Sequence, residues 1–251
     1  MKTITFSAIK GGVGKSSLAI ITANILAATG HKVLCIDGDP QNSMTFYYVP
    51  DINNSNGSLA DVLMGDNIND NITNIQNMNN IDIIPSSLDL VTCKDIYPQA
   101  LKDNLATIAK SYDYCIIDTA PTFDSVTLNC LEAANVIISP VQFSQFDYKS
   151  AVFYKELLIK LDLIDKWFLL FNRFKAIRIG SSSFTAQYLS LFTNTFIKNV
   201  LVARIPDSTL IKQYIDARIK ITPAKNKIAL FEATTAFVKE ISGEKRIPIS
   251  F

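Results

Sequence analysis

Short apolar runs alternate along this chain with longer stretches in which apolar residues recur at helical spacing. An apolar run of about five or six residues that ends in a polar or turn-forming group is typical of a strand buried on both faces. Strands are predicted at Thr3–Ala8, Lys32–Ile36, Ile81–Pro85, Tyr114–Asp118, Val136–Pro140, Trp167–Asn172 and Val200–Ile205. Between them the pattern predicts helices, as expected of βαβ units.

Eight stretches with apolar residues at helical spacing are predicted to form helices. They lie at Lys15–Thr29, Ser58–Met64, Pro98–Ser111, Asp124–Ala133, Phe146–Leu161, Ser181–Phe196, Asp207–Ala217 and Lys225–Ile241. Strands that alternate with helices predict an α/β fold, a doubly wound and mostly parallel sheet with helices on both faces. The last of these stretches has apolar residues at helical spacing and is expected to pack back onto the sheet.

The chain shows no internal repeat and no domain linker. Residues 53–80 hold ten asparagines among 28 residues, which disfavours long regular elements and indicates surface loops. We therefore expect a single domain over residues 1–251.

Composition narrows the class of protein. The chain has 251 residues, 48% of them hydrophobic and 19% charged, enough for a large core and unlike a disordered chain. Its four cysteines stand singly and outside any metal-ligand spacing, so each is interpreted as a small buried side chain. No run approaches the roughly 18 apolar residues of a membrane span, and the N-terminus lacks a signal-peptide layout. A cytoplasmic protein is expected.

Charge is distributed unevenly. Up to Asp165 there are 10 Lys and Arg against 18 Asp and Glu, a net charge of −8, and from Lys166 onward there are 14 against 5, a net charge of +9. A basic half of this kind is expected of a surface that meets a polyanion, either nucleic acid or an acidic membrane. Scattered solubilising charge is the alternative.

The segment between the first predicted strand and the first predicted helix carries the clearest chemistry. It reads Lys10-Gly11-Gly12-Val13-Gly14-Lys15-Ser16-Ser17. Glycines let the backbone fold around phosphates so that amide N–H groups point inward, and the start of a helix adds its positive end. Lys15 is placed to reach the β- and γ-phosphates, and the Ser16 hydroxyl to bind Mg²⁺. This segment predicts a nucleotide-phosphate loop.

Lys10 directly precedes the first glycine, which a simple phosphate loop does not require. The string KGGVGKSS resembles the deviant Walker A motif of the ParA/MinD ATPases. The next strand ends in IDGDPQ (36–41), similar to the DxDPQ element of the ParA (Soj) branch, and YDYCIIDTAP (112–121) is like the family's Walker B strand and the switch that follows it. These motifs occur in family order along most of the chain.

The resemblance implies an ATPase whose two subunits enclose ATP and Mg²⁺ in a homodimer, with Lys10 crossing to the phosphates of the partner. Asp39 matches the residue that positions the attacking water, and Lys10 and Lys15 would neutralise charge on the phosphates. Asp37 and Asp118 would support the metal with Ser16 and Asp39, although a helix-capping role is the alternative for both. Residues 119–124 would sense the γ-phosphate. Slow basal hydrolysis is expected because these motifs contain no arginine finger.

Two further assignments concern residues that would contact adenine and residues that would contact DNA. Asn172 corresponds to an adenine contact, with a strand-end turn as the alternative, and Pro206 and Asp207 fall in the loop that lines the base, where Asp207 is equally a candidate helix N-cap. The basic half resembles the patch by which such dimers bind DNA non-specifically. Its candidate residues are Arg178, Lys198, Arg204, Arg218, Lys220, Lys225 and Lys227.

The resemblance also implies a partner, a ParB-like or other adaptor that stimulates hydrolysis, in a protein that segregates DNA or positions another cargo. One alternative is a nucleotide-switch regulator that docks a protein without binding DNA. Another is a MinD-like protein on a membrane, although residues 242–251 are short and contain Pro248, which argues against a terminal membrane helix. Ser16-Ser17 in place of the commoner Thr-Thr, and the TAP that follows Asp118, depart from the family pattern.

Overall fold

The fold is built on one sheet. The computed structural model describes residues 1–51, 53, 55–75, 78, 80–174, 184–217 and 228–243. Its strands are β1 (Lys2–Phe6), β2 (Val33–Gly38), β3 (Thr73–Asn74), β4 (Ile81–Ile84), β5 (Tyr114–Thr119), β6 (Val136–Val141), β7 (Trp167–Phe174) and β8 (Val200–Pro206). They form an eight-stranded sheet in the order β3-β4-β2-β5-β1-β6-β7-β8. Every pair is parallel except β3 with β4.

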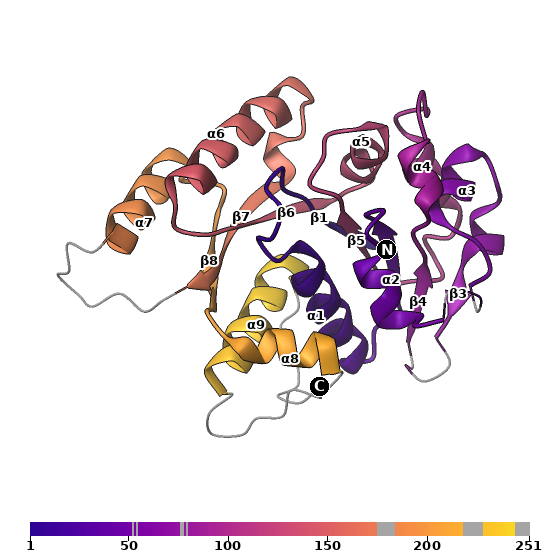
Figure 1. Ribbon diagram of the computed structural model, residues 1–251, viewed down its shortest axis with the longest axis horizontal. Coiled ribbons are helices and arrows are strands. Elements are labelled where there is room, and N and C mark those ends of the chain that lie inside the picture. The colour runs from indigo at the N-terminus through magenta and orange to yellow at the C-terminus, as the bar shows by residue number, and fades with distance from the viewer. Residues whose placement is uncertain are drawn as a thin grey trace.

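Helices cover both faces of this sheet, as the sequence predicts (Figure 1). One layer holds α1 (Lys15–Ala28), α2 (Ser43–Tyr48), α8 (Thr209–Ala217) and α9 (Ile228–Ser242), whose apolar side chains share one core cluster. The other layer holds α3 (Leu59–Met64), α4 (Ala100–Thr107), α5 (Ser125–Glu132), α6 (Gln145–Lys160) and α7 (Phe184–Thr195). The doubly wound α/β prediction is therefore confirmed.

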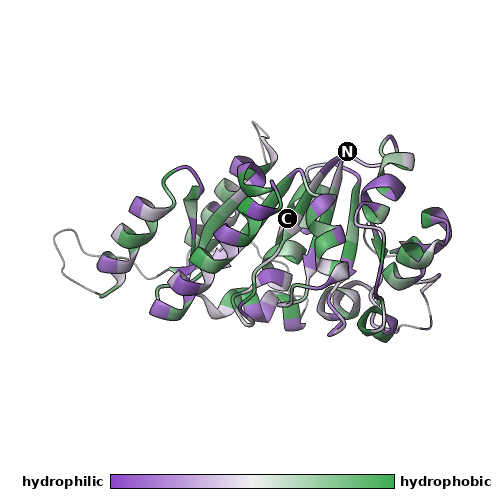
Figure 2. Ribbon diagram, turned by 90° about the horizontal axis from the view of Figure 1, so that it is seen from above, coloured by the Kyte–Doolittle hydropathy of each residue, from purple (hydrophilic) through white to green (hydrophobic). Residues whose placement is uncertain are grey.

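The apolar runs of the strands explain why helices pack on both faces of the sheet. Successive side chains of a strand point to opposite faces, so an apolar run supplies both layers at once. On β5, Ile116 contacts the α1 side, whereas Cys115 and Ile117 contact the α3 side. Figure 2 shows the apolar strands in the middle and polar helix surfaces outside. All four cysteines are buried and free, as expected.

Short elements depart from the prediction. Helix α2 was not predicted from the sequence, and its first turn is held by hydrogen bonds from Thr45 to Asp37. The asparagine-rich stretch holds, besides the predicted α3, a 3₁₀ turn at Ile68–Asn71 and the two residues of β3, so it is more than surface loop. Asn71 in that turn is itself buried, at 3% exposure.

Helix ends also differ from the pattern. The helix predicted over Pro98–Ser111 is only Ala100–Thr107, since beyond it the chain tightens into turns before β5. The helix predicted from Asp207 begins at Thr209. Among the described helices, none combines the length and apolar character that crossing a bilayer requires.

The parallel sheet places the sequence-predicted residues at one edge. The carboxyl ends of parallel strands meet at the same edge, which is where open α/β sheets bind ligands. The phosphate loop follows the central strand β1, with Asp37 near the end of β2, Asp118 near the end of β5 and Asn172 near the end of β7. The fold thus gathers residues that are far apart in the sequence.

Candidate nucleotide site

The loop between β1 and α1 depends on its glycines. Gly12 has φ 72° and Gly14 has φ 101°, left-handed conformations that glycine adopts without steric cost. Gly14 occupies the N-cap position of α1, so the loop runs directly into the amide end of that helix. This is the strand, glycine loop and helix arrangement that binds phosphate groups.

Lys15 begins α1 and is buried, with 6% of its surface exposed. Burial lowers the pKa of its ammonium group, whereas the charges of Asp118 and Asp39 raise it. The carboxylates of Asp118 and Asp39 therefore act electrostatically on this buried ammonium group. Lys15 therefore provides a fixed positive charge at the mouth of the loop.

Asp118 lies opposite Lys15 and is fully buried. Neither of its carboxylate oxygens has a hydrogen-bond partner among the described residues. Burial and the neighbouring Asp37 raise its pKa well above the ordinary range, and the Ser16 hydroxyl and Lys15 act in the opposite direction. An unsatisfied buried carboxylate near a hydroxyl fits the surroundings of Mg²⁺, which takes few protein ligands and several waters or phosphate oxygens.

Asp37 has a different environment. Its carboxylate accepts hydrogen bonds from the backbone N–H of Asp39 at 3.1 Å and from the backbone N–H and hydroxyl of Thr45, both at 2.8 Å. Burial raises its pKa to about 6, and these hydrogen bonds lower it. In this structure Asp37 holds the first turn of α2.

Asp39 lies in the segment between β2 and α2. One carboxylate oxygen accepts the backbone N–H of Gln41 at 2.9 Å, and its carbonyl accepts the Ser86 hydroxyl at 2.8 Å. Asp39 is 8% exposed. Within the described part of the chain, no three Asp, Glu, His or Cys side chains converge on one cation position. The three predicted acids, Asp37, Asp39 and Asp118, therefore form no complete carboxylate ligand set in the described residues.

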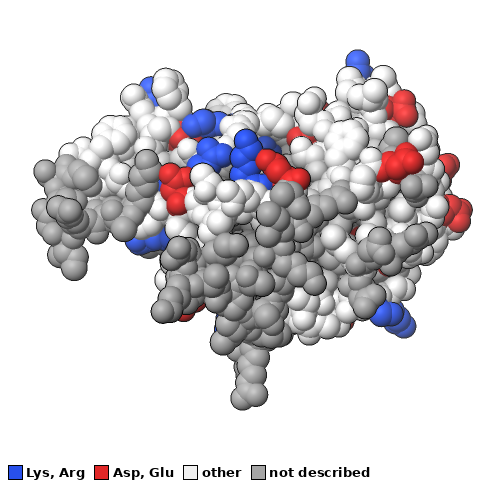
Figure 3. All heavy atoms as spheres, turned by 60° about the horizontal axis from the view of Figure 1, so that its bottom comes forward, with Lys and Arg blue, Asp and Glu red and all other residues white. Residues whose placement is uncertain are grey.

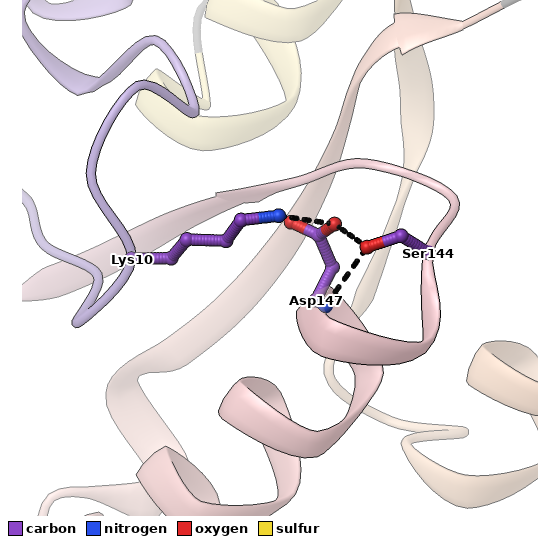
Figure 4. A network of polar contacts seen from close by, with 3 residues as sticks. All are labelled: Lys10, Ser144 and Asp147. Atoms are coloured by element: carbon purple, nitrogen blue, oxygen red, sulfur yellow. Dashed lines mark hydrogen bonds and ion pairs between the residues drawn. The ribbon is translucent and has the colours of Figure 1, made fainter.

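Lys10 makes a contact that sequence reasoning missed. Its ammonium group lies 2.7 Å from the carboxylate of Asp147, which is only 2% exposed (Figure 4). Ser144 caps α6 by accepting the backbone N–H of Asp147 at 3.1 Å, and its hydroxyl contacts the same carboxylate. The Ser-x-x-Asp spacing signals this cap, but nothing in the sequence pairs Asp147 with Lys10.

Asn172 lies against the phosphate loop. Its amide nitrogen donates to the carbonyl of Val13 at 2.7 Å, and its amide oxygen accepts the backbone N–H of Arg173 at 2.9 Å. It is 4% exposed. The structure therefore places Asn172 beside the glycine loop.

The predicted base loop follows β8. Pro206 ends this strand, and the backbone N–H of Asp207 donates to the carbonyl of Phe174 at 3.0 Å. Ser208, not Asp207, accepts the backbone N–H of Leu210 at the start of α8. Asp207 also lines a cavity of about 530 Å³ with Lys10, Asp147 and Arg173, so the segments after β1, β6 and β8 and the end of β7 meet around one hollow.

Of the seven basic residues predicted to contact DNA, two lie among the described residues. Arg178, Arg218, Lys220, Lys225 and Lys227 lie outside the described residues. Lys198 lies in the turn before β8, and Arg204 lies near the end of that strand. Arg204 lies over the ring of Phe174, 5.0 Å from its centre. On the face in Figure 3, described Lys and Arg side chains gather next to Asp and Glu side chains and form no patch of one sign.

Comparison with known proteins places these features in a family. A family model described as an AAA domain matches residues 1–165. The maintenance of carboxysome distribution protein A of Synechococcus elongatus is 28% identical over 169 residues, 65% of each chain. The chromosome-partitioning ATPase Soj of Treponema pallidum is 33% identical over 155 residues, 58% of each chain. The match spans less than two thirds of the length of either relative.

A solved structure extends the match along the chain. A protein of Borrelia burgdorferi assigned to plasmid partition and bound to AMPPNP is 31% identical, with a TM-score of 0.78, and the alignment covers 96% of this chain and 99% of that one. The glycine loop, the acids at the neighbouring strand ends and these matches agree. The chain belongs to the ParA/MinD family of ATPases and is of the ParA/Soj partition type.

Proposed function

We propose that this chain binds ATP with Mg²⁺, hydrolyses it slowly, and uses the cycle to partition DNA or to position another cargo. The observation that carries the proposal is the meeting of Lys15, Ser16 and the unsatisfied carboxylate of Asp118 at the end of the glycine loop. A buried ammonium group and a buried carboxyl group without a hydrogen-bond partner are costly unless a ligand uses both. A magnesium-bound triphosphate would do so.

The residues divide the work. The loop amides and Lys15 would bind the phosphates, and Ser16 and Asp118 would hold Mg²⁺, which supplies positive charge to the phosphate oxygens. Asp39, at the edge of this group, would position the attacking water. Asp37 supports them indirectly by holding α2.

Dimerisation is the second part of the proposal. Lys10 lines the same cavity as Asp207 and Arg173, and its side chain extends to Asp147 rather than into the glycine loop. In a homodimer it would move to the phosphates of the other subunit, and ATP would join the two chains because its charge attracts both lysines. An adaptor protein would then stimulate hydrolysis and end the cycle.

DNA binding is the third part. The net charge of +9 from Lys166 onward supports a surface that meets phosphates without reading bases. The name of the Soj relative includes chromosome partition, whereas that of the Synechococcus relative concerns carboxysome distribution. The cargo proposed here therefore extends to a protein body positioned along DNA.

An active-site variant tests the enzymatic part. We expect Asp39→Ala to bind ATP with nearly unchanged affinity and to lose hydrolysis, because the side chain would act on water rather than on the nucleotide. Binding is measured by titration calorimetry and turnover by phosphate release. Asp89→Ala, an exposed acid in a 3₁₀ turn, is the control and should hydrolyse ATP as the wild type does. Normal turnover in Asp39→Ala would remove Asp39 from the mechanism.

A further inference from the structure

Asn172 and the phosphate loop are separated by 159 residues in sequence, yet they are joined by a buried hydrogen bond. The orientation of the Asn172 amide is determined by its surroundings. The backbone N–H of Arg173 can only donate, so it selects the amide oxygen, and the NH₂ group is left to face the carbonyl of Val13.

The backbone of β7 is bent at this point. Arg173 has φ 53°, a left-handed conformation that costs a residue other than glycine about 1 kcal/mol or more. The pairing of β7 with β8 shifts register between Phe171 and Phe174, as at a β-bulge. Bulges beside functional sites commonly redirect a side chain. Here the irregularity lies directly next to Asn172, whose side chain contacts the loop.

The loop is shaped to receive it. A β-carbon at Gly14 would lie 2.4 Å from the amide nitrogen of Asn172, much closer than van der Waals contact. The third glycine of the motif therefore leaves the space in which the Asn172 amide sits. Val13, whose carbonyl accepts the hydrogen bond, is 1% exposed, so water does not compete for that carbonyl.

We propose that Asn172 is a positioning residue that holds the phosphate loop in its binding shape, and that it acts on phosphate whatever base is attached. The peptide between Val13 and Gly14 is planar and trans, so its carbonyl and its N–H point in opposite directions. With the Val13 carbonyl held by Asn172, the N–H of Gly14 points away from Asn172 and is presented to a ligand. The inference rests on the proposed nucleotide binding.

This role differs from an adenine contact in the ligands it affects. A residue that touches only the base alters the affinity for ATP and leaves inorganic triphosphate unaffected. A residue that fixes the loop alters both ligands by the same factor. Inorganic triphosphate with Mg²⁺ is therefore the decisive probe.

The experiment compares Asn172→Ala with the wild type by titration calorimetry, using Mg²⁺ with ATP and Mg²⁺ with inorganic triphosphate. We expect about tenfold weaker binding of both ligands, which corresponds to about 1.4 kcal/mol. Asn104→Ala is the matched control, because that amide also donates to a backbone carbonyl, at 3.0 Å, but lies within α4. It should leave the binding of both ligands unchanged. Asn172→Ser replaces the alanine variant if that variant does not fold.

A second measurement separates loop positioning from general destabilisation. Without ligand, amide hydrogen exchange at residues 11–15 should accelerate in the variant while the strands β1 and β5 keep their protection. Loss of ATP affinity with unchanged triphosphate affinity would overturn the inference in favour of a base contact, and unchanged binding of both would remove Asn172 from the site. A wild type that binds neither ligand would overturn the proposed function, and the inference with it.

Discussion

At the scale of single residues, Lys10 has one observed partner, Asp147, and one proposed partner, the nucleotide of a second subunit. In the structure it pairs with Asp147 of its own chain, and the other carboxylate oxygen of Asp147 is buried without a partner among the described residues. If Lys10 crosses to the neighbouring subunit, that carboxylate loses its cation. Removing Lys10 is therefore expected to affect both the proposed dimerisation and the stability of the single chain.

A double variant separates these effects. We expect Lys10→Ala to lower the unfolding free energy by about 1–2 kcal/mol, because it strands a buried carboxylate, and to abolish ATP-dependent dimerisation. Adding Asp147→Asn should restore most of the stability without restoring the dimer. Urea unfolding and light scattering measure the two properties. A Lys10→Ala chain that dimerises normally with ATP would contradict the proposed role of Lys10.

Asp147 and Asn172 also show where residue patterns stop being informative. The loop glycines, Lys15 and the acids after β2 and β5 could be predicted because each stands in a short motif beside its own strand. The contacts Lys10 with Asp147 and Val13 with Asn172 span 137 and 159 residues. No local pattern encodes such pairs, since they follow from which strands become neighbours.

At the scale of elements, α2 depends on Asp37. The hydroxyl of Thr45, within the first turn of α2, donates to the Asp37 carboxylate at 2.8 Å and accepts the backbone N–H of Ser86 at 3.0 Å. Thr45 is fully buried, so water cannot replace these bonds. This short helix is therefore held by polar contacts to the strand end and escapes prediction from apolar spacing.

The anchor of α2 should depend on pH. The pKa of Asp37 rises from 3.8 to about 6 on burial, so the folded chain holds this proton more tightly than the unfolded chain does. The stability that proton binding at Asp37 adds to the folded chain is therefore complete below about pH 4 and is lost as the pH rises through 6. Above pH 6 Asp37 is charged, and the hydrogen bonds that Thr45 donates to it then contribute most to stability. We expect Thr45→Val to lower the unfolding free energy by about 2 kcal/mol at pH 8, and by less at pH 5.

Urea unfolding of the nucleotide-free chain at the two pH values measures the difference. Thr107→Val is the matched control, because its exposed hydroxyl donates to the carbonyl of Asn104 in its own helix. That variant should show no dependence on pH. Equal losses for Thr45→Val at pH 5 and pH 8 would exclude the charged hydrogen bond as the anchor.

At the scale of the whole molecule, charge and nucleotide state are expected to act together. The acidic part of the chain carries most of the candidate nucleotide residues, and the basic part carries the candidate DNA residues. A dimer presents two basic surfaces, so it meets more phosphates than a single chain does. ATP would thereby raise the affinity for DNA without touching it.

Retention on non-specific duplex DNA tests this coupling. With ATP, we expect retention that falls as salt is raised, and with ADP little retention. The double change Lys225→Ala with Lys227→Ala should reduce the slope of log affinity against log salt by about 1 for each DNA phosphate that these lysines neutralise. Lys94→Ala with Lys102→Ala, the same change of charge in the acidic part, should have no effect. Absence of retention in the wild type would favour the regulator that docks a protein without DNA.

The central place of β1 has a consequence for the order in which the protein matures during synthesis. Strand β1 leaves the ribosome before its neighbours in the sheet, β5 and β6. Asn172, which donates a hydrogen bond to Val13, is synthesised later still. A nascent chain of about 110 residues already has the whole glycine motif, yet it lacks the neighbours that support it. If the chain binds ATP as proposed, we therefore expect nucleotide capture to come late in synthesis, so that an unfinished chain would not join a complete subunit.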